Sequence, residues 1–161
     1  MSEINYRLAN EADMPVIAGM YDQLDCFFRS LSYHFPQVDN VGQLWLDSFR
    51  RTLGRFSVVF VAELDGKVVG FMLGRVKRVP PYLGGVLVGE LSDMWVEPDA
   101  RRLHIGDRLS EITIEWLRAQ GVHSIELQIL EGNEPIWRLY ERMGFKPELR
   151  QLRLTWEAPD A

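Results

Sequence analysis

Two adjacent arginines lie between a strand-like and a helix-like segment near the middle of the chain. Residues 90–96 alternate in the manner of a strand, and apolar residues then recur with a helical period over residues 105–117. The first N–H groups of a helix lack internal partners and carry partial positive charge, so they can bind phosphate oxygens. Arg101 and Arg102 add charged donors, and Gly106 allows close backbone approach. The sequence therefore predicts a turn that binds phosphate.

This turn belongs to a longer pattern. Residues 96–98 read VEP, residues 101–106 read RRLHIG, and residues 133–145 read NEPIWRLYERMGF. Over residues 58–156 the chain resembles the GNAT superfamily of N-acetyltransferases, whose signatures are Q/R-x-x-G-x-G/A and N-x-x-A-x-x-x-Y-x-x-x-G-F. His104 replaces the first glycine of the first signature. Because histidine adopts left-handed conformations more readily than most residues, we expect the loop to keep its shape with the imidazole pointing outward.

The resemblance implies an enzyme that transfers acetyl from acetyl-CoA to a primary amine by direct attack in a ternary complex. His34 and His123 have no metal-ligand spacing with a cysteine or an acid cluster, so we expect no metal. A lysine-like amine has a pKa near 10.4, so a base is needed at neutral pH. Glu90 matches the general base of some family members, whereas other members use a chain of waters, and the same carboxylate could simply pair with an arginine. Asp93 is the second candidate, expected on the opposite face because it lies three positions further along the strand.

Tyr140 occupies the position of the family's general acid. A phenol there would return a proton to the CoA thiolate as it leaves. The alternative is a tyrosine of the core, because Tyr140 shares a helical stripe with Ile136 and Met143.

The resemblance also assigns residues to the cofactor. The backbone of Met94 and Val96 is expected to pair with the pantetheine arm, and the Met94 N–H to stabilise an oxyanion. Asn133 could cap its helix, contact the cofactor arm, or do both. Trp137 could pack on the pantetheine or in the core. The full predicted cofactor-binding set is Met94, Trp95, Val96, Arg101, Arg102, His104, Ile105, Gly106, Asp107, Asn133 and Trp137.

The elements that would position these residues follow from periodicity, turns and helix caps. They give one domain, residues 1–161, with the order β-α-α-β-β-β-α-β-α-β-β. The resemblance implies an α/β fold of the GNAT type, a mixed and mostly antiparallel sheet of about seven strands flanked by helices. The expected strands are 3–8, 57–63, 67–77, 90–96, 122–130, 145–147 and 149–156, and the expected helices are 10–29, 41–53, 105–121 and 133–144.

Composition limits the classes of partner. The 161 residues carry a net charge of −5, which argues against a broad nucleic-acid surface. The single cysteine, Cys26, excludes an intramolecular disulfide and a cysteine-based metal site. No signal peptide and no apolar run long enough for a membrane span is evident, so we expect a cytoplasmic protein without membrane partners. A homodimer is possible, because the family often associates through its last strands.

The acceptor is a small-molecule or peptide amine that the sequence does not identify. Aromatic residues and the acids Asp22 and Asp25 in the first third could form its pocket, or they could belong to an ordinary amphipathic helix. A non-catalytic acyl-CoA-binding or regulatory module is the alternative function, kept open by His104. A nucleotide-binding protein is a weaker alternative, because the sequence lacks the phosphate-loop motif G-x-x-x-x-G-K-[ST].

Overall fold

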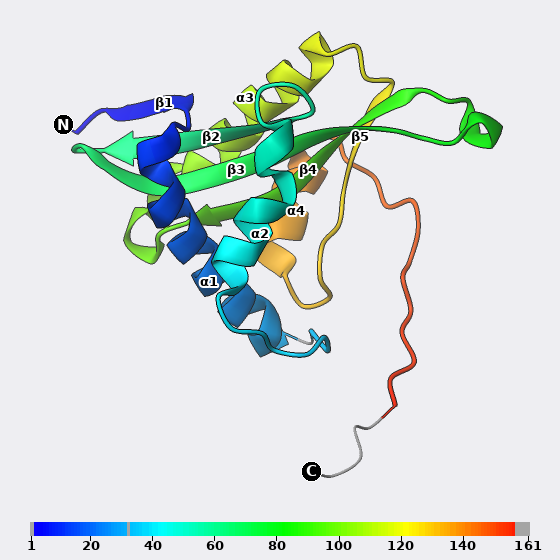
Figure 1. Cartoon of the computed structure of the whole chain (residues 1–161), viewed down its shortest axis with the longest axis horizontal. Coiled ribbons are helices and arrows are strands. Elements are labelled where there is room, and N and C mark those ends of the chain that lie inside the picture. The colour runs from blue at the N-terminus through cyan, green and yellow to red at the C-terminus, as the bar shows by residue number, and fades with distance from the viewer. Residues whose placement is uncertain (1, 32, 157–161) are drawn as a thin grey trace.

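One mixed sheet runs through the middle of the molecule (Figure 1). The computed structural model describes residues 2–31 and 33–156, and in that part of the chain the sheet has five strands in the order β1-β2-β3-β4-β5. The first four strands are antiparallel neighbours, and β5 is parallel to β4. The strands are β1 Ile4–Leu8, β2 Ser57–Leu64, β3 Lys67–Arg78, β4 Leu87–Val96 and β5 Ser124–Leu127.

Helices cover both faces of the sheet (Figure 1). Helices α1 (Met14–Leu31) and α2 (Val41–Phe49) pack on one face. Helices α3 (Ile105–Ala119) and α4 (Glu134–Arg142) pack on the other. The two faces therefore enclose two separate apolar cores, as expected for a sheet between two helical layers.

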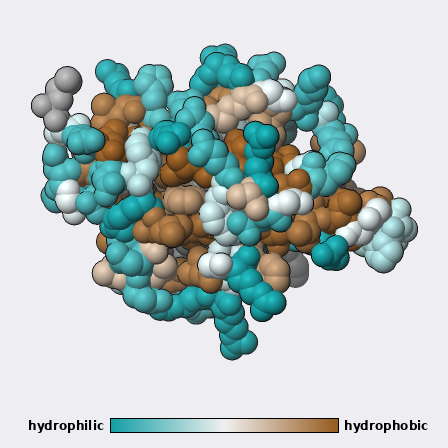
Figure 2. Space-filling view, turned by 90° about the horizontal axis from the view of Figure 1, so that it is seen from above, coloured by the Kyte–Doolittle hydropathy of each residue, from teal (hydrophilic) through white to brown (hydrophobic). Residues whose placement is uncertain are grey.

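Hydrophilic residues form most of the outline in the space-filling view from above, with hydrophobic residues visible between them (Figure 2). In the part of the chain that the structure describes, every helix is too short or too polar to cross a bilayer.

The structure confirms the predicted hairpin turn and the predicted parallel strand pair. Asp65 and Gly66 connect β2 to β3 with φ values of 50° and 78°, which is the expected primed hairpin turn. The expected parallel pairing of β4 with β5 is also present. Several boundaries differ from prediction. β4 begins at Leu87 instead of residue 90, α2 gives way to a 3₁₀ turn over Arg50–Thr52, and β5 is shorter than the expected strand over residues 122–130.

The chain after α4 does not form the two predicted strands. Residues 145–156 have no regular structure, and the segment leads away from the body of the molecule (Figure 1). Four of its large apolar side chains are 78–90% exposed, namely Leu149, Leu152, Leu154 and Trp156. The alternation is strand-like, but a strand also needs a partner edge, and that requirement is not local to the sequence.

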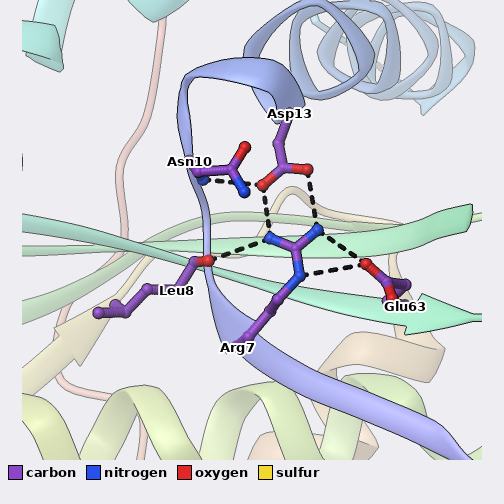
Figure 3. A network of polar contacts seen from close by, with 5 residues as sticks. All are labelled: Arg7, Leu8, Asn10, Asp13 and Glu63. Carbon is purple, nitrogen blue, oxygen red and sulfur yellow. Dashed lines mark hydrogen bonds and ion pairs between the residues drawn. The ribbon is translucent and has the colours of Figure 1, made fainter. Parts of the chain in front are cut away.

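A network of ion pairs joins β1 to its surroundings (Figure 3). Arg7 Nη1 lies 2.6 Å from Asp13 Oδ2, and Nη2 lies 2.8 Å from Glu63 Oε2. Asp13 also accepts a hydrogen bond of 2.8 Å from the backbone N–H of Asn10. These contacts hold the start of the first helical segment against β1 and β2. The guanidinium of Arg7 holds the pKa of the Asp13 carboxyl below its usual range.

Candidate active site

A β-bulge in β4 decides which way its acidic side chains point. In the strand register, Glu90 lies opposite Arg75 of β3 and Asp93 lies opposite Leu73. Over this stretch β4 therefore advances by three residues while β3 advances by two. An extra residue inverts the alternation of side chains beyond it. Asp93 therefore lies on the same face as Glu90, the face covered by α1 and α2, and the prediction of opposite faces was wrong. Leu91, between them, packs in the core on the α3 side.

The strands β4 and β5 pair over only four residues each. Their ladder joins Val88–Leu91 to Ser124–Leu127, whereas β4 continues to Val96. Within the described residues, positions 93 to 96 of β4 pair with β3 on one side and with no strand on the other. Its backbone groups on that open side need partners. This segment contains Met94 and Val96, the positions predicted to pair with the pantetheine arm.

The turn between β4 and α3 has the predicted shape. A 3₁₀ segment, Pro98–Leu103, leads to His104, which adopts the left-handed conformation with φ 56° and ψ 29°. The His104 side chain is 87% exposed, so the imidazole points outward as expected, and its Nδ1 lies 3.3 Å from Asp107 Oδ2. α3 then begins at Ile105 and presents its first amides at this turn.

Gly106 brings this first turn close to β4. A Cβ atom placed on Gly106 would lie 3.3 Å from Met94 Cε and 3.4 Å from Met94 Sδ. The absence of a side chain therefore lets the helix pack closely against the strand that carries Met94. A strand edge without a partner beside a helix N-terminus suits an extended ligand that ends in a diphosphate.

The two arginines of the turn behave differently. Arg101 donates from Nε to the Val96 carbonyl at 3.0 Å, and its guanidinium lies 4.6 Å from the centre of the Trp95 ring. Both arginines are exposed, but among the contacts of the described residues only Arg101 makes a side-chain hydrogen bond, and this bond ties the turn to the end of β4. The sequence reasoning missed Arg142 of α4, which lies 3.5 Å from Asp107 in the first turn of α3.

Tyr140 lies at the junction of these elements. Its side chain is buried, and its hydroxyl lies 3.1 Å from Ser110 Oγ of α3. Burial raises the pKa of Tyr140 to about 12, and the contact with Ser110 opposes that rise. Phe145 packs edge-on against the phenol, with 5.4 Å between ring centres.

Ser110 connects Tyr140 to the other predicted site residues. Its Oγ lies 2.8 Å from the Gly106 carbonyl and 3.9 Å from Met94 Sδ. The structure therefore brings together Met94 of β4, Gly106 of α3 and Tyr140 of α4. Sequence reasoning missed Ser110, whose only signal was a small polar residue beside Leu109 on the helix stripe.

The two carboxylates of β4 have different surroundings. Glu90 accepts hydrogen bonds from Ser92 Oγ at 2.8 Å and from Lys77 Nζ at 3.2 Å. Lys77 also forms an ion pair with Glu126 of β5. These contacts differ from the pairing with an arginine that the sequence left open.

Asp93 lies deeper, against the N-terminal helices. Its Oδ2 accepts from Trp45 Nε1 of α2 at 2.9 Å, and Tyr21 of α1 stacks on the Trp45 ring with 4.3 Å between ring centres. Burial raises the pKa of the Asp93 carboxyl, while Trp45 and Arg75 oppose the shift. Aromatic residues of α1 and α2 thus surround Asp93, on the face where an acceptor pocket was expected.

Two acids predicted for that pocket have structural partners instead. Asp22 accepts from the backbone N–H of Gly42 at 2.8 Å, and Asp25 pairs with Arg29 at 2.8 Å. Asp22 thereby joins α1 to the first turn of α2. These contacts fit the alternative of an ordinary structural helix.

Asn133 occupies the cap position of α4, but its side chain makes no capping hydrogen bond. The backbone carbonyl of Asn133 instead accepts from the N–H of Trp137 at 3.2 Å. The expected side-chain cap is therefore absent, and a role of this amide toward the cofactor remains a prediction. Trp137 is half-buried, so the structure leaves both of its proposed environments open.

Comparison with known proteins identifies a family, two sequence relatives and a similar fold. The sequence pattern described as the Acetyltransferase (GNAT) family matches residues 18–145. Mycothiol acetyltransferase of Thermomonospora curvata is 36% identical over 87 residues, which cover 54% of this chain and 27% of that protein. Glucosamine 6-phosphate N-acetyltransferase of Trypanosoma brucei brucei is 29% identical over 120 residues, which cover 74% of this chain and 78% of that protein.

A solved structure shows the same fold. The crystal structure of a predicted acetyltransferase with acetyl-CoA from Clostridium acetobutylicum has a TM-score of 0.77 and 19% identity, and the match covers 95% of this chain and 96% of that chain. The chain thus spans nearly all of this structure, but only about a quarter of the length of the mycothiol acetyltransferase it matches.

Proposed function

The chain belongs to the GNAT family of acetyltransferases, and from this premise we propose that it transfers an acetyl group from acetyl-CoA to a primary amine by direct attack in a ternary complex. The observation that carries the proposal is the position of Tyr140. Its hydroxyl contacts Ser110, which in turn contacts the first turn of α3 and the side chain of Met94. A buried acid therefore lies beside both elements predicted to bind the cofactor.

The proposed cofactor site uses the open side of β4 and the first turn of α3. Acetyl-CoA would supply the thioester and, later, the leaving thiolate. The backbone from Ser92 to Val96 would pair with the extended arm, and the amides after His104 would bind the diphosphate. Arg102 and Arg142 would add positive charge near the diphosphate. Arg101 is less available for this role, because it donates a hydrogen bond to the Val96 carbonyl. Tyr140 would give its proton to the leaving sulfur.

The acceptor would approach from the face covered by α1 and α2. The bulge puts Asp93 on the same face as Glu90, and the two carboxylates would attract an incoming ammonium group before one of them accepts its proton. We retain Glu90 as the proposed base, because its side chain is partly open to solvent (26% exposed) and can pass the proton on. Asp93, held by Trp45, is the second candidate and could alternatively position the amine.

The acceptor itself is proposed only by class. Glucosamine 6-phosphate, named for the trypanosomal relative, is one example of a small primary amine, and a peptide amine is the other class that we include. The cytoplasmic setting expected from the sequence belongs to this proposal as well.

Release of free thiol from acetyl-CoA, followed against a panel of small amines and peptides, tests the proposal. We expect amine-dependent release with at least one member of the panel. The alternative, a non-catalytic acyl-CoA-binding module, predicts a rise in Tm with acetyl-CoA but no release with any amine. That second result would overturn the enzymatic proposal.

We also propose a homodimer through the last segment of the chain. Residues 149–156 expose alternating apolar side chains, and in the described residues the outer edge of β5 has no strand partner. Both features are liabilities in a monomer. Sedimentation of the wild type against a Leu152→Asp, Leu154→Asp variant measures this directly, and a wild type that stays monomeric at high concentration would contradict it.

A further inference from the structure

We propose that Ser110 is a positioning residue for Tyr140: it fixes the phenol in the neutral enzyme and then donates its own hydrogen to the phenolate formed during turnover. The inference rests on the proposed acid role of Tyr140. It assigns a task to a residue that lies outside both family signatures.

We assign a direction to the resting hydrogen bonds from the acceptors that surround Ser110. A serine hydroxyl has one hydrogen, and the Gly106 carbonyl, at 2.8 Å from Ser110 Oγ, can only accept it. Ser110 Oγ is then left to accept from the Tyr140 hydroxyl at 3.1 Å. Ser110 is fully buried and Tyr140 is 5% exposed, so bulk water does not compete for these groups. In this resting arrangement the phenol hydrogen points at Ser110, and it turns toward the leaving sulfur when it is transferred.

The direction of the hydrogen bond between Tyr140 and Ser110 can reverse. When Tyr140 gives its proton to the leaving sulfur, the S–H bond forms and the negative charge stays on the phenol oxygen. The Ser110 hydroxyl can rotate toward that oxygen, because the Gly106 carbonyl keeps the backbone N–H of residue 110 as its regular helical partner. No buried acceptor is left unpaired. Tyr140 afterwards recovers a proton from solvent.

This reversal favours the transition state. A hydrogen bond to the charged form of an acid lowers its pKa, whereas burial raises it. Ser110 opposes the effect of burial on the pKa of Tyr140 in this direction. The phenol is therefore a stronger acid with Ser110 than it would be in an apolar pocket, and proton transfer to the thiolate becomes easier.

Thr113 provides a matched control on the same helix. It is also fully buried, and its Oγ1 donates to the Leu109 carbonyl at 2.7 Å, four residues earlier, just as Ser110 bonds to Gly106. Its methyl group packs near Gly74 rather than near the phenol. Removing either hydroxyl costs a similar backbone contact, but only Ser110 touches Tyr140.

The experiment compares Ser110→Ala, Thr113→Val, Tyr140→Phe and the double variant Ser110→Ala/Tyr140→Phe in the full chain, with an amine found active in the panel. We expect Ser110→Ala to lower kcat about five- to tenfold, with the KM for acetyl-CoA changed less than twofold. Thr113→Val should keep wild-type kcat. The double variant should be no slower than Tyr140→Phe, because Ser110 acts only through the phenol.

The outcomes separate this inference from the function on which it rests. Full turnover in Tyr140→Phe overturns the acid role itself. A slow Tyr140→Phe with wild-type kcat in Ser110→Ala overturns only the role of Ser110. If the reductions in kcat of the two single variants multiply in the double variant, the role of Ser110 is also overturned. The same holds if Thr113→Val lowers kcat as much as Ser110→Ala does, because the effect is then structural. Ser110→Cys, which fills the same space with a weaker donor, gives an intermediate kcat and tests the same point if the alanine variant folds poorly.

Discussion

Among single residues, the proposed acid is a phenol that stays protonated. Burial raises the pKa of Tyr140 to about 12, so at neutral pH nearly every molecule holds the proton that the leaving thiolate needs. The carboxylates lie on the opposite side of the strand from this phenol, because Glu90 and Asp93 face α1 and α2 while Tyr140 packs on the α3 side. The proposed acid and the proposed base therefore lie on opposite faces of β4.

Tyr140→Phe should lower kcat by about a hundredfold, since general acids typically contribute at least that factor. The affinity for CoA should stay within about twofold, because the ring and its packing against Phe145 remain. Steady-state kinetics with calorimetric titration of CoA checks both numbers. A large loss of CoA affinity with unchanged kcat would show a binding role instead.

Glu90→Gln and Asp93→Asn distinguish the two candidate bases. If Glu90 accepts the proton, Glu90→Gln should lower kcat/KM about a hundredfold at neutral pH and regain much of it at high pH, where the amine is already deprotonated. If Asp93 is the base, its burial-raised pKa means that the rate should climb with pH through a value above that of an ordinary aspartate, and Asp93→Asn should remove that climb. Kinetics over a pH series records the difference. Equal, pH-independent losses would indicate positioning by both.

Among the elements, strand β4 contains a bulge that coincides with two local features. The bulge near Ser92 moves Asp93 to the face of Glu90, and β5 stops pairing at Leu91, just before the bulge. The turn that follows is equally specific, because His104 takes a left-handed conformation that favours glycine. The irregular parts of the chain are therefore the parts that form the proposed cofactor site.

His104→Gly should raise the free energy of unfolding slightly, by up to about 1 kcal/mol, because it removes the steric cost of a left-handed side chain. The His104 side chain is 87% exposed, so little packing is lost. His104→Val should lower stability, since a β-branched residue resists this conformation more strongly. Urea denaturation of the three proteins gives the order, and a glycine variant clearly less stable than the wild type would contradict it.

At the scale of the whole molecule, the sheet separates two tasks. The α3 and α4 side carries the proposed cofactor groups and the acid, and the α1 and α2 side carries the proposed base and acceptor pocket. The helical layer on the acceptor side is attached at its start by Arg7, which pairs with Asp13 and Glu63 (Figure 3). This network lies away from the proposed site and contributes to stability rather than to chemistry.

Arg7→Met should lower the free energy of unfolding by about 2 kcal/mol, because Asp13, with only 8% of its side chain exposed, loses its charged partner. In the wild type the folded pKa of Asp13 is depressed by Arg7. The ion pair of Asp13 with Arg7 therefore stabilises the fold at pH values above the pKa of the unfolded carboxyl, about 4. This stabilisation is lost as the pH falls through the lower pKa of Asp13 in the folded protein.

The variant should accordingly lose less stability than the wild type between about pH 5 and pH 2. Thermal or urea unfolding at several pH values measures both slopes. Amine acetylation at neutral pH should be unchanged in the folded variant, which serves as the control. Parallel pH profiles for the two proteins would show that the ion pair does not supply this stability.

Features that depend on neighbours along the chain could be predicted from the residues alone: the helical stripe of α3, the primed turn at Asp65, the left-handed residue at His104 and the signatures around Gly106 and Tyr140. Three features became visible only in the folded molecule: the face that Asp93 occupies, the residue that contacts the Tyr140 hydroxyl, and the position of residues 149–156 outside the sheet. The physical reason is the range of the interactions. Turn conformations and helix periods are set within a few residues, whereas a bulge, a buried hydrogen bond between two helices and the addition of an edge strand each require a partner from a distant part of the chain.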